Sequence, residues 1–150
     1  SGAPDQKICE QILKNDVFYK ELPKSFDRND FHQVIEPVNK LEIQDSLASL
    51  AYIHAKVLVK NIELYCSKTP KSIYICGGGL KNKSLMKYMK EAMPKIKIES
   101  TAEIGFDPDQ IEAQAFAFLG IRRSLGLPIS FQKTTGISPE IDSFLVSSQY

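Results

Sequence analysis

Residues 72–82, Ser-Ile-Tyr-Ile-Cys-Gly-Gly-Gly-Leu-Lys-Asn, decide the fold class, because a short apolar run ends abruptly in three glycines. Residues 72–76 predict a buried strand, since isoleucine and tyrosine favour extended backbone and no charge interrupts them. Residues 82–93 then predict a helix, which Pro94 ends. A strand, a glycine turn and a helix in this order indicate an α/β protein.

The sequence on both sides of this stretch continues the alternation of helix and strand. Apolar residues recur at three- and four-residue spacing over residues 44–65, which predicts a long helix. Residues 95–100 predict a second strand, and residues 108–123 predict a third helix. This order implies parallel strands with helices packed against them. Because two strands make a poor sheet on their own, we expect an incomplete sheet flanked by helices.

The same spacing predicts which side of each helix is buried. In the long helix the predicted inward positions are Leu47, Leu50, Ala51, His54, Leu58, Ile62 and Tyr65. In the second and third helices they are Leu85, Met86, Met89, Ile111, Ala115, Phe118 and Leu119. His54 is therefore expected to be a core histidine rather than a catalytic base. Residues 6–20 predict a short helix, and residues 21–31 an irregular connection.

Composition limits the class of protein. The chain has 150 residues, of which 43% are hydrophobic and 25% charged, as in a soluble domain. Nineteen basic against 18 acidic residues give a net charge of +1, which argues against general nucleic-acid binding. No run is long enough for a membrane helix. Three cysteines without a C-x-x-C pattern indicate neither a disulfide framework nor a zinc site, so we expect a cytoplasmic protein.

The glycine turn, Gly77 to Gly79, lies where α/β proteins bind ligands, at the carboxyl end of a strand. Glycine lets the backbone approach a phosphate closely, and a following helix N-terminus attracts negative charge. The residues alone leave two interpretations open: a nucleotide or phosphate site, and a tight turn without a ligand. A dinucleotide site would use Glu99 for the ribose, but the third glycine of G-x-G-x-x-G is missing, and no Walker A sequence occurs.

Acidic residues precede and begin the third predicted helix. Asp107 and Asp109 are expected to cap this helix and to complement its dipole. Glu112 lies among small residues, Glu-Ala-Gln-Ala-Phe-Ala-Phe-Leu-Gly, which would let the helix approach another element closely.

Ordered motifs occur along residues 6–136. The patterns C-G-G-G-x-x-N-x-x-L-M, T-x-x-x-G, E-A-x-A-F-A-x-L-A and G-x-P…x-T-G match residues 76–86, 101–105, 112–120 and 126–136. Upstream, residues 23–31 resemble P-K-S-T-G-R-E-x-F, and residues 44–50 resemble D-x-Q-A-T-L-x-x-L. In this order the motifs make the chain similar to the anhydro-N-acetylmuramic acid kinase family. The chain departs from these patterns at Phe26 and Asp27, which replace Thr and Gly, and at Gly120, which replaces Ala.

This resemblance implies the C-terminal half of an actin-like ATPase fold, ribonuclease H-like, as in sugar kinases, Hsp70 and actin. Residues 1–150 would form one nucleotide-binding domain of a two-domain kinase. The family phosphorylates 1,6-anhydro-N-acetylmuramic acid with ATP and Mg²⁺ and opens its anhydro ring, giving N-acetylmuramic acid 6-phosphate in bacterial peptidoglycan recycling. The family's G-T-S-x-D-G motif and its expected catalytic aspartate belong to an N-terminal half that this sequence lacks. The resemblance therefore implies no catalytic residue here, and an inactive isolated chain.

The resemblance also implies roles for particular residues. The expected ATP contacts are Gly77, Gly78, Gly79, Asn82 and Glu112. The expected sugar contacts are Lys24, Ser25 and Arg28, and no residue of the chain is expected to bind metal directly. Expected partners are ATP, the sugar, the N-terminal half and a second copy in a homodimer. Two alternatives stay open: a non-catalytic nucleotide- or partner-binding module, and a Rossmann-like dinucleotide-binding domain.

Overall fold

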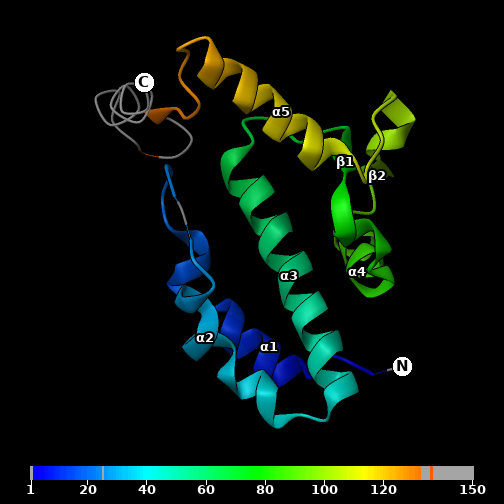
Figure 1. The fold of residues 1–150 in the computed structure, drawn as a ribbon. Coiled ribbons are helices and arrows are strands. Elements are labelled where there is room, and N and C mark those ends of the chain that lie inside the picture. The colour runs from blue at the N-terminus through cyan, green and yellow to red at the C-terminus, as the bar shows by residue number, and fades with distance from the viewer. Residues whose placement is uncertain (1, 25, 133–135, 137–150) are drawn as a thin grey trace.

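The computed structural model describes residues 2–24, 26–132 and 136. In chain order the helices and strands are α1 (Gln6–Leu13), α2 (Asn29–Ile35), α3 (Ile43–Tyr65), β1 (Ser72–Ile75), α4 (Lys83–Ala92), β2 (Lys97–Ser100) and α5 (Ile111–Ser124). Figure 1 shows α3 as the long central helix, with α1 and α2 beside its first half and α5 across its other end. The predicted alternation of helices and strands from residue 44 onward is confirmed.

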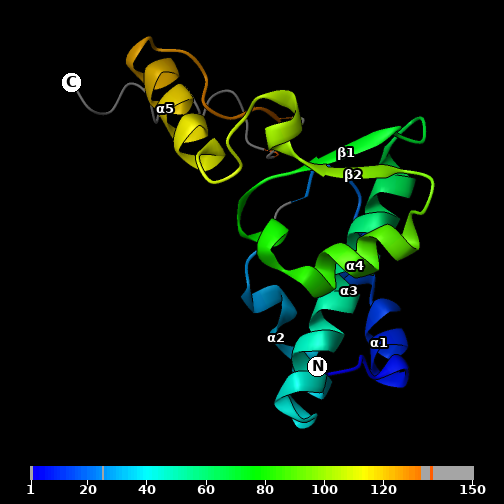
Figure 2. The same ribbon diagram turned by 90° about the vertical axis from the view of Figure 1, so that its right-hand side faces the viewer.

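The sheet consists of β1 and β2, which run parallel with Ile73 opposite Ile98 and Ile75 opposite Ser100. Helix α4 forms the crossover between them, as a parallel pair requires. Figure 2 shows α3 and α4 together on one side of this strand pair. The structure is therefore a mixed helix–strand arrangement around a small parallel sheet.

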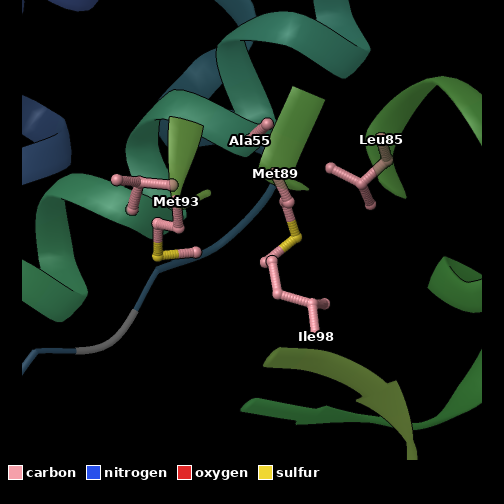
Figure 3. Packing of buried hydrophobic residues seen from close by; sticks show 6 residues of the cluster. Ala55, Leu85, Met89, Met93 and Ile98 are labelled. Atoms are coloured by element: carbon pink, nitrogen blue, oxygen red, sulfur yellow. The ribbon is translucent and has the colours of Figure 1, made fainter. Parts of the chain in front are cut away.

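One hydrophobic cluster joins the sheet to α3 and α4 (Figure 3). Its buried members are Ala55, Val59, Leu85, Met89, Met93 and Ile98. Leu85 and Met89 confirm the predicted inward side of α4, and Met86 packs against the cluster while remaining partly exposed. Burying two large side chains of a ten-residue helix, Leu85 and Met89, holds α4 against its neighbours.

A second cluster lies between α1, α3 and the segment that connects α1 to α3. Its buried members are Cys9, Ile12, Phe18, Val38 and Ile53. The polar side chain of Ser49 is fully buried there and accepts a hydrogen bond from the Asp5 N–H at 3.0 Å. Burial raises the pKa of the Cys9 thiol, whose Sγ donates to the Ser49 carbonyl oxygen at 3.8 Å.

The predicted inward side of α3 is wrong at several positions. Leu47, His54 and Tyr65 are exposed, and only Ala51 among the predicted set is buried. The other buried positions are Ala48, Ser49, Ile53, Ala55 and Val59. Helix α3 packs against α1 on one side and α4 on another, and small side chains allow the close approach that two neighbours require.

The predicted inward side of α5 is also wrong. No residue of α5 is buried: Ala115 and Phe118 are exposed, and Ile111 and Leu119 are only partly covered. Figures 1 and 2 show α5 running away from the sheet beyond the end of α3. The predicted irregular connection is wrong in part as well, because α2 begins within it, at Asn29.

Candidate functional site

The candidate site lies at the carboxyl edge of the sheet. Because β1 and β2 are parallel, the segments that follow Ile75 and Ser100 leave the sheet at the same edge. Each begins with a short 3₁₀ helix, Gly77–Lys81 after β1 and Thr101–Ile104 after β2. The three glycines that the sequence singled out therefore lie at the edge where α/β sheets in general bind their ligands.

Gly77 shapes the turn and connects it to the start of α5. Its φ is +70°, a left-handed conformation that side chains rarely adopt. Its N–H donates to the Pro108 carbonyl oxygen at 2.8 Å, so this donor is already used. A Cβ at Gly77 would lie 3.9 Å from Glu112 Oε1. The structure thus brings two of the predicted ATP contacts, Gly77 and Glu112, side by side.

Gly78 is the open position of the turn. A Cβ built there meets no atom within 4 Å, and the residue is exposed. Gly79 is more enclosed, because a Cβ there would contact Leu85 Cδ2 at 3.8 Å and its carbonyl accepts the Asn82 N–H at 3.2 Å. Of the three glycines, Gly78 leaves the most room for a ligand against the backbone.

Asn82 is the N-cap of α4. Its Oδ1 accepts the N–H of Leu85 at 3.0 Å, which satisfies one of the free donors of the first turn. The three glycines lie within the 3₁₀ turn Gly77–Lys81, which precedes this cap, and the predicted start of the helix at Asn82 is confirmed. The site therefore offers glycine backbone to a ligand more than it offers a helix end.

Charged side chains surround the turn. Lys81 Nζ lies 2.9 Å from Asp109 Oδ1 in an exposed ion pair that joins the turn to the residues before α5. Asp107 Oδ1 accepts the N–H of Asp109 at 2.9 Å. The predicted capping of α5 by these aspartates is wrong, because Gln110 occupies the N-cap and makes no side-chain hydrogen bond there. The aspartates instead order the loop that reaches the glycine turn.

Thr101 is a candidate that the analysis of the sequence missed. It follows β2 directly, its exposed fraction is 6%, and its hydroxyl has no hydrogen-bond partner among the described residues. Its carbonyl accepts the N–H of Phe106 at 3.1 Å, which closes the loop after β2. A buried hydroxyl without a partner costs free energy unless a ligand or water satisfies it. The only sequence signal was its place in the T-x-x-x-G pattern.

Glu99, which the dinucleotide hypothesis assigns to the ribose, already forms an ion pair. Glu99 Oε1 lies 2.6 Å from Lys97 Nζ, and the hydrogen bond to Glu99 raises the pKa of this lysine. A ribose hydroxyl would have to compete with that ammonium group for the carboxylate. The geometry therefore favours the glycine turn over Glu99 as the point of contact with a ligand.

The predicted sugar contact Lys24 lies apart from the glycine turn. Lys24 Nζ bonds to Asn61 Oδ1 and lies 4.5 Å from the centre of the Tyr65 ring, so α3 holds this side chain. Arg28 is exposed immediately before α2, and Ser25 lies outside the described residues. Lys24 lines an open, mainly apolar cavity of about 660 Å³, whose lining includes no residue of the glycine turn. Within the described part of the chain, Lys24 and the glycine turn do not line the same cavity.

Residues 2–24, 26–132 and 136 contain neither a cluster of metal ligands nor a membrane-spanning helix. This part of the chain holds no group of three or more His, Cys, Asp or Glu side chains arranged for a metal ion. None of its helices combines the length and apolar character needed to cross a bilayer.

The geometry defines a class: an α/β protein with a glycine turn at the carboxyl edge of a parallel sheet. The family model described as Anhydro-N-acetylmuramic acid kinase matches residues 1–144. The chain belongs to this family, and the resemblance found in the ordered motifs is confirmed.

Curated relatives carry the same name. The anhydro-N-acetylmuramic acid kinase of Roseobacter denitrificans is 35% identical over 146 residues, which cover 97% of this chain and 38% of the relative. The protein of Ruegeria sp. is 36% identical over 136 residues, and that of Phenylobacterium zucineum 34% identical over 137. Each of these two matches covers 91% of this chain and 36% of the relative. The chain thus spans well under half the length of the relatives it matches.

Proposed function

We propose that this chain is the nucleotide-binding part of an ATP-dependent kinase that opens and phosphorylates 1,6-anhydro-N-acetylmuramic acid, giving N-acetylmuramic acid 6-phosphate in cell-wall recycling. The observation that carries the proposal is the open backbone at Gly78, on the carboxyl edge of a parallel sheet in a member of this kinase family. We assign the chain to the C-terminal half of an actin-like ATPase fold. The parallel strands with α3 and α4 on one side support this assignment.

The residues of the turn would share the work of holding ATP. Gly78 lets the nucleotide lie against the backbone, while Gly77 and its bond to Pro108 keep the turn in shape. Asn82 orders the start of α4, and the Thr101 hydroxyl supplies a polar group at the neighbouring strand end. The Glu112 carboxylate lies beside the turn, where Mg²⁺ carried by ATP would offset its repulsion of the phosphates. Bound Mg-ATP supplies the phosphoryl group.

The sugar would meet a different part of the chain. Arg28 is exposed, and its guanidinium suits the sugar carboxylate as a bidentate partner. Lys24, which Asn61 and Tyr65 hold, would position the segment before Arg28. Ser25 remains a proposed contact. The base that activates water and the G-T-S-x-D-G motif would come from the rest of the kinase, so we expect no turnover by this chain alone.

Calorimetric titration of the chain with Mg-ATP tests the nucleotide site, with NADH as the control ligand. We expect wild type to bind Mg-ATP and Gly78→Val to bind at least tenfold more weakly, because a side chain there would occupy the space of the ligand. The fold should survive, since a Cβ at this position meets no atom within 4 Å. Gly120→Val is the matched control, because Gly120 is equally unobstructed but lies in α5.

The titration separates the competing functions. Equal Mg-ATP binding by wild type and Gly78→Val, with unchanged circular dichroism, would remove the glycine turn from the proposal. Binding of NADH in place of Mg-ATP would support the dinucleotide alternative, which predicts that Glu99→Ala weakens binding.

A further inference from the structure

An open cavity of about 660 Å³ lies between α3, α2 and the residues that precede α2. Figure 1 shows α2 beside the first half of α3. Cavities that bind small molecules usually measure about 300–1,000 Å³ and have mainly apolar walls with a few polar groups. None of the described residues that line this cavity belongs to the glycine turn, so it is a second candidate site. Its apolar walls include Phe18, Phe26, Phe31, Leu50, Ile53 and Val57.

Three phenylalanine rings form one wall of the cavity. The ring centres of Phe18 and Phe31 lie 5.8 Å apart in a stacked arrangement, and those of Phe26 and Phe31 lie 5.4 Å apart. Phe18 is buried, whereas Phe26 and Phe31 keep part of their surface exposed. Because each ring packs against a neighbour, the wall is formed before a ligand arrives, and the exposed parts of two rings remain to be covered.

A positive charge is held at the same cavity. Lys24 lines it, and the Lys24 Nζ donates to Asn61 Oδ1 and lies 4.5 Å from the centre of the Tyr65 ring. Asn61 is itself held, because its Nδ2 donates to the carbonyl oxygens of Val57 at 2.8 Å and Phe18 at 3.1 Å. An ammonium group has three N–H donors, so Lys24 retains donors for a ligand. Its position is fixed in advance, which lowers the entropy cost of binding one.

Within the described residues, no carboxylate neutralises this charge. None of the described ion pairs includes Lys24 or Lys20, whose Nζ lies 5.5 Å from the centre of the Phe26 ring. The carboxylates of Asp27 and Asp30 each accept a backbone N–H of the loop that leads into α2. A cation that lies beside apolar walls without a paired anion favours an anionic ligand.

We propose that this cavity binds a free fatty carboxylate, whose alkyl chain lies along the phenylalanine wall and whose carboxylate meets the Lys24 ammonium group. One anion matches one held cation, and an unbranched alkyl chain matches the apolar walls. Besides Lys24 and Asn61, the only polar side chain in the described lining is the exposed His54. A nucleotide or sugar fits less well, because most of its hydroxyl groups would lose water without gaining a hydrogen-bond partner.

Calorimetric titration of the chain with sodium hexanoate, octanoate and decanoate, without nucleotide or sugar, tests this site. We expect one molecule to bind per chain. The affinity should rise about fourfold for each added CH₂ group, because each group leaves water for the apolar walls. Decanol has the same chain length and no charge, and it should bind at least tenfold more weakly than decanoate.

Variants separate the contribution of the charge from that of the walls. Lys24→Met should weaken decanoate binding at least tenfold and leave decanol binding unchanged, because only the carboxylate needs the ammonium group. Phe26→Ser should weaken the binding of both ligands. Phe26 belongs to neither buried cluster, so the fold should survive, as circular dichroism will show. Lys90→Met is the matched control, because Lys90 is an exposed lysine of α4 that does not line the cavity.

NMR spectra of the isoleucine methyl groups locate the ligand. Decanoate should shift the signals of Ile35 and Ile53, which line the cavity, and leave that of Ile98, which is buried in the other cluster. Because the mixture contains no ATP, failure of this test leaves the nucleotide proposal standing. Loss of the nucleotide site in Gly78→Val likewise leaves the fatty carboxylate site standing.

Several outcomes overturn the proposal. Wild type that binds no decanoate, decanol that binds as tightly as decanoate, or Lys24→Met that binds decanoate like wild type would each do so. A dimer of the chain that Phe26→Ser dissociates would make a second copy the occupant. A chain ending at Gly136 that binds decanoate when the whole chain does not would make residues 137–150 the occupant. That alternative has a starting point, because a Cβ at Gly136 would lie 3.5 Å from Pro23 Cγ.

Discussion

Helices α4 and α5 each follow a strand of the same sheet, yet α4 has buried residues and α5 has none. The shorter helix, α4, buries Leu85 and Met89 and leads into buried Met93. The longer helix, α5, has more aromatic side chains and buries none of its residues. Apolar content therefore does not decide burial here. Helix α4 has a covering surface, and among the described residues α5 has none.

Topology explains the difference. Helix α4 is the crossover between two parallel strands, so the chain must return across the sheet and press the helix against it. Helix α5 follows the last described strand, and no described strand after it brings the chain back. The start of α5 is nevertheless attached, through Pro108 and Asp109, to the glycine turn.

The largest expected effect compares truncation of one side chain in each helix. Met89→Ala should lower the free energy of unfolding by about 2–5 kcal/mol, because it opens a cavity among Ala55, Leu85 and Ile98. Phe116→Ala should change it by less than about 0.5 kcal/mol, since that ring is exposed. Urea denaturation followed by circular dichroism measures both values. Similar losses in the two variants would mean that α5 is packed in solution.

A smaller effect compares the two helix starts. Asn82→Ala should cost about 1 kcal/mol, because the side chain caps α4 through the Leu85 N–H. Gln110→Ala at the corresponding position of α5 should cost little, since that side chain makes no capping bond. The same denaturation experiment gives both values, and Asn82→Asp, which keeps a capping oxygen, should restore most of the loss. A costly Gln110 variant would contradict the difference drawn between the helices.

The part of the fold that could be predicted from the sequence is the strand–helix–strand unit, because its two strands pair with each other and its helix packs against them. Residues 72–100 hold two strands and a crossover helix, and spacing identified both the elements and the buried side of α4. Spacing was less informative for α3, where small residues, among them Ala48 and Ser49, form the buried contacts. The side of α3 that is buried depends on which helices pack against it. The spacing of apolar residues within α3 alone does not identify those neighbours.

The candidate site shows the same limit. Three consecutive glycines after a strand were visible in the sequence, but the pattern did not distinguish open Gly78 from Gly77, whose N–H is bonded to Pro108. Thr101 was missed because one threonine after a strand has no periodicity, and only its burial without a partner singles it out. Glu112 lies close to Gly77 because of the conformation of the loop before α5. The spacing of apolar residues within α4 or α5 does not predict the conformation of that loop.

The smallest expected effect concerns the ion pair between the glycine turn and the residues before α5. Lys81 and Asp109 are both exposed, so a double-mutant cycle of Lys81→Ala and Asp109→Ala should give a coupling of about 0.2–1 kcal/mol in unfolding free energy. The coupling should fall in 1 M salt, because water and ions screen exposed charges. The exposed pair Lys87–Glu91 within α4 is the matched control.

The size of this coupling bears directly on how α5 is held. A value no larger than that of the control pair would mean that the ion pair contributes little and that the Gly77–Pro108 backbone bond is the main attachment of α5. A coupling well above 1 kcal/mol that persists in salt would require the two charges to be shielded from water. Helix α5 would then lie closer to the glycine turn in solution, and its contrast with α4 would be smaller than the exposed side chains indicate.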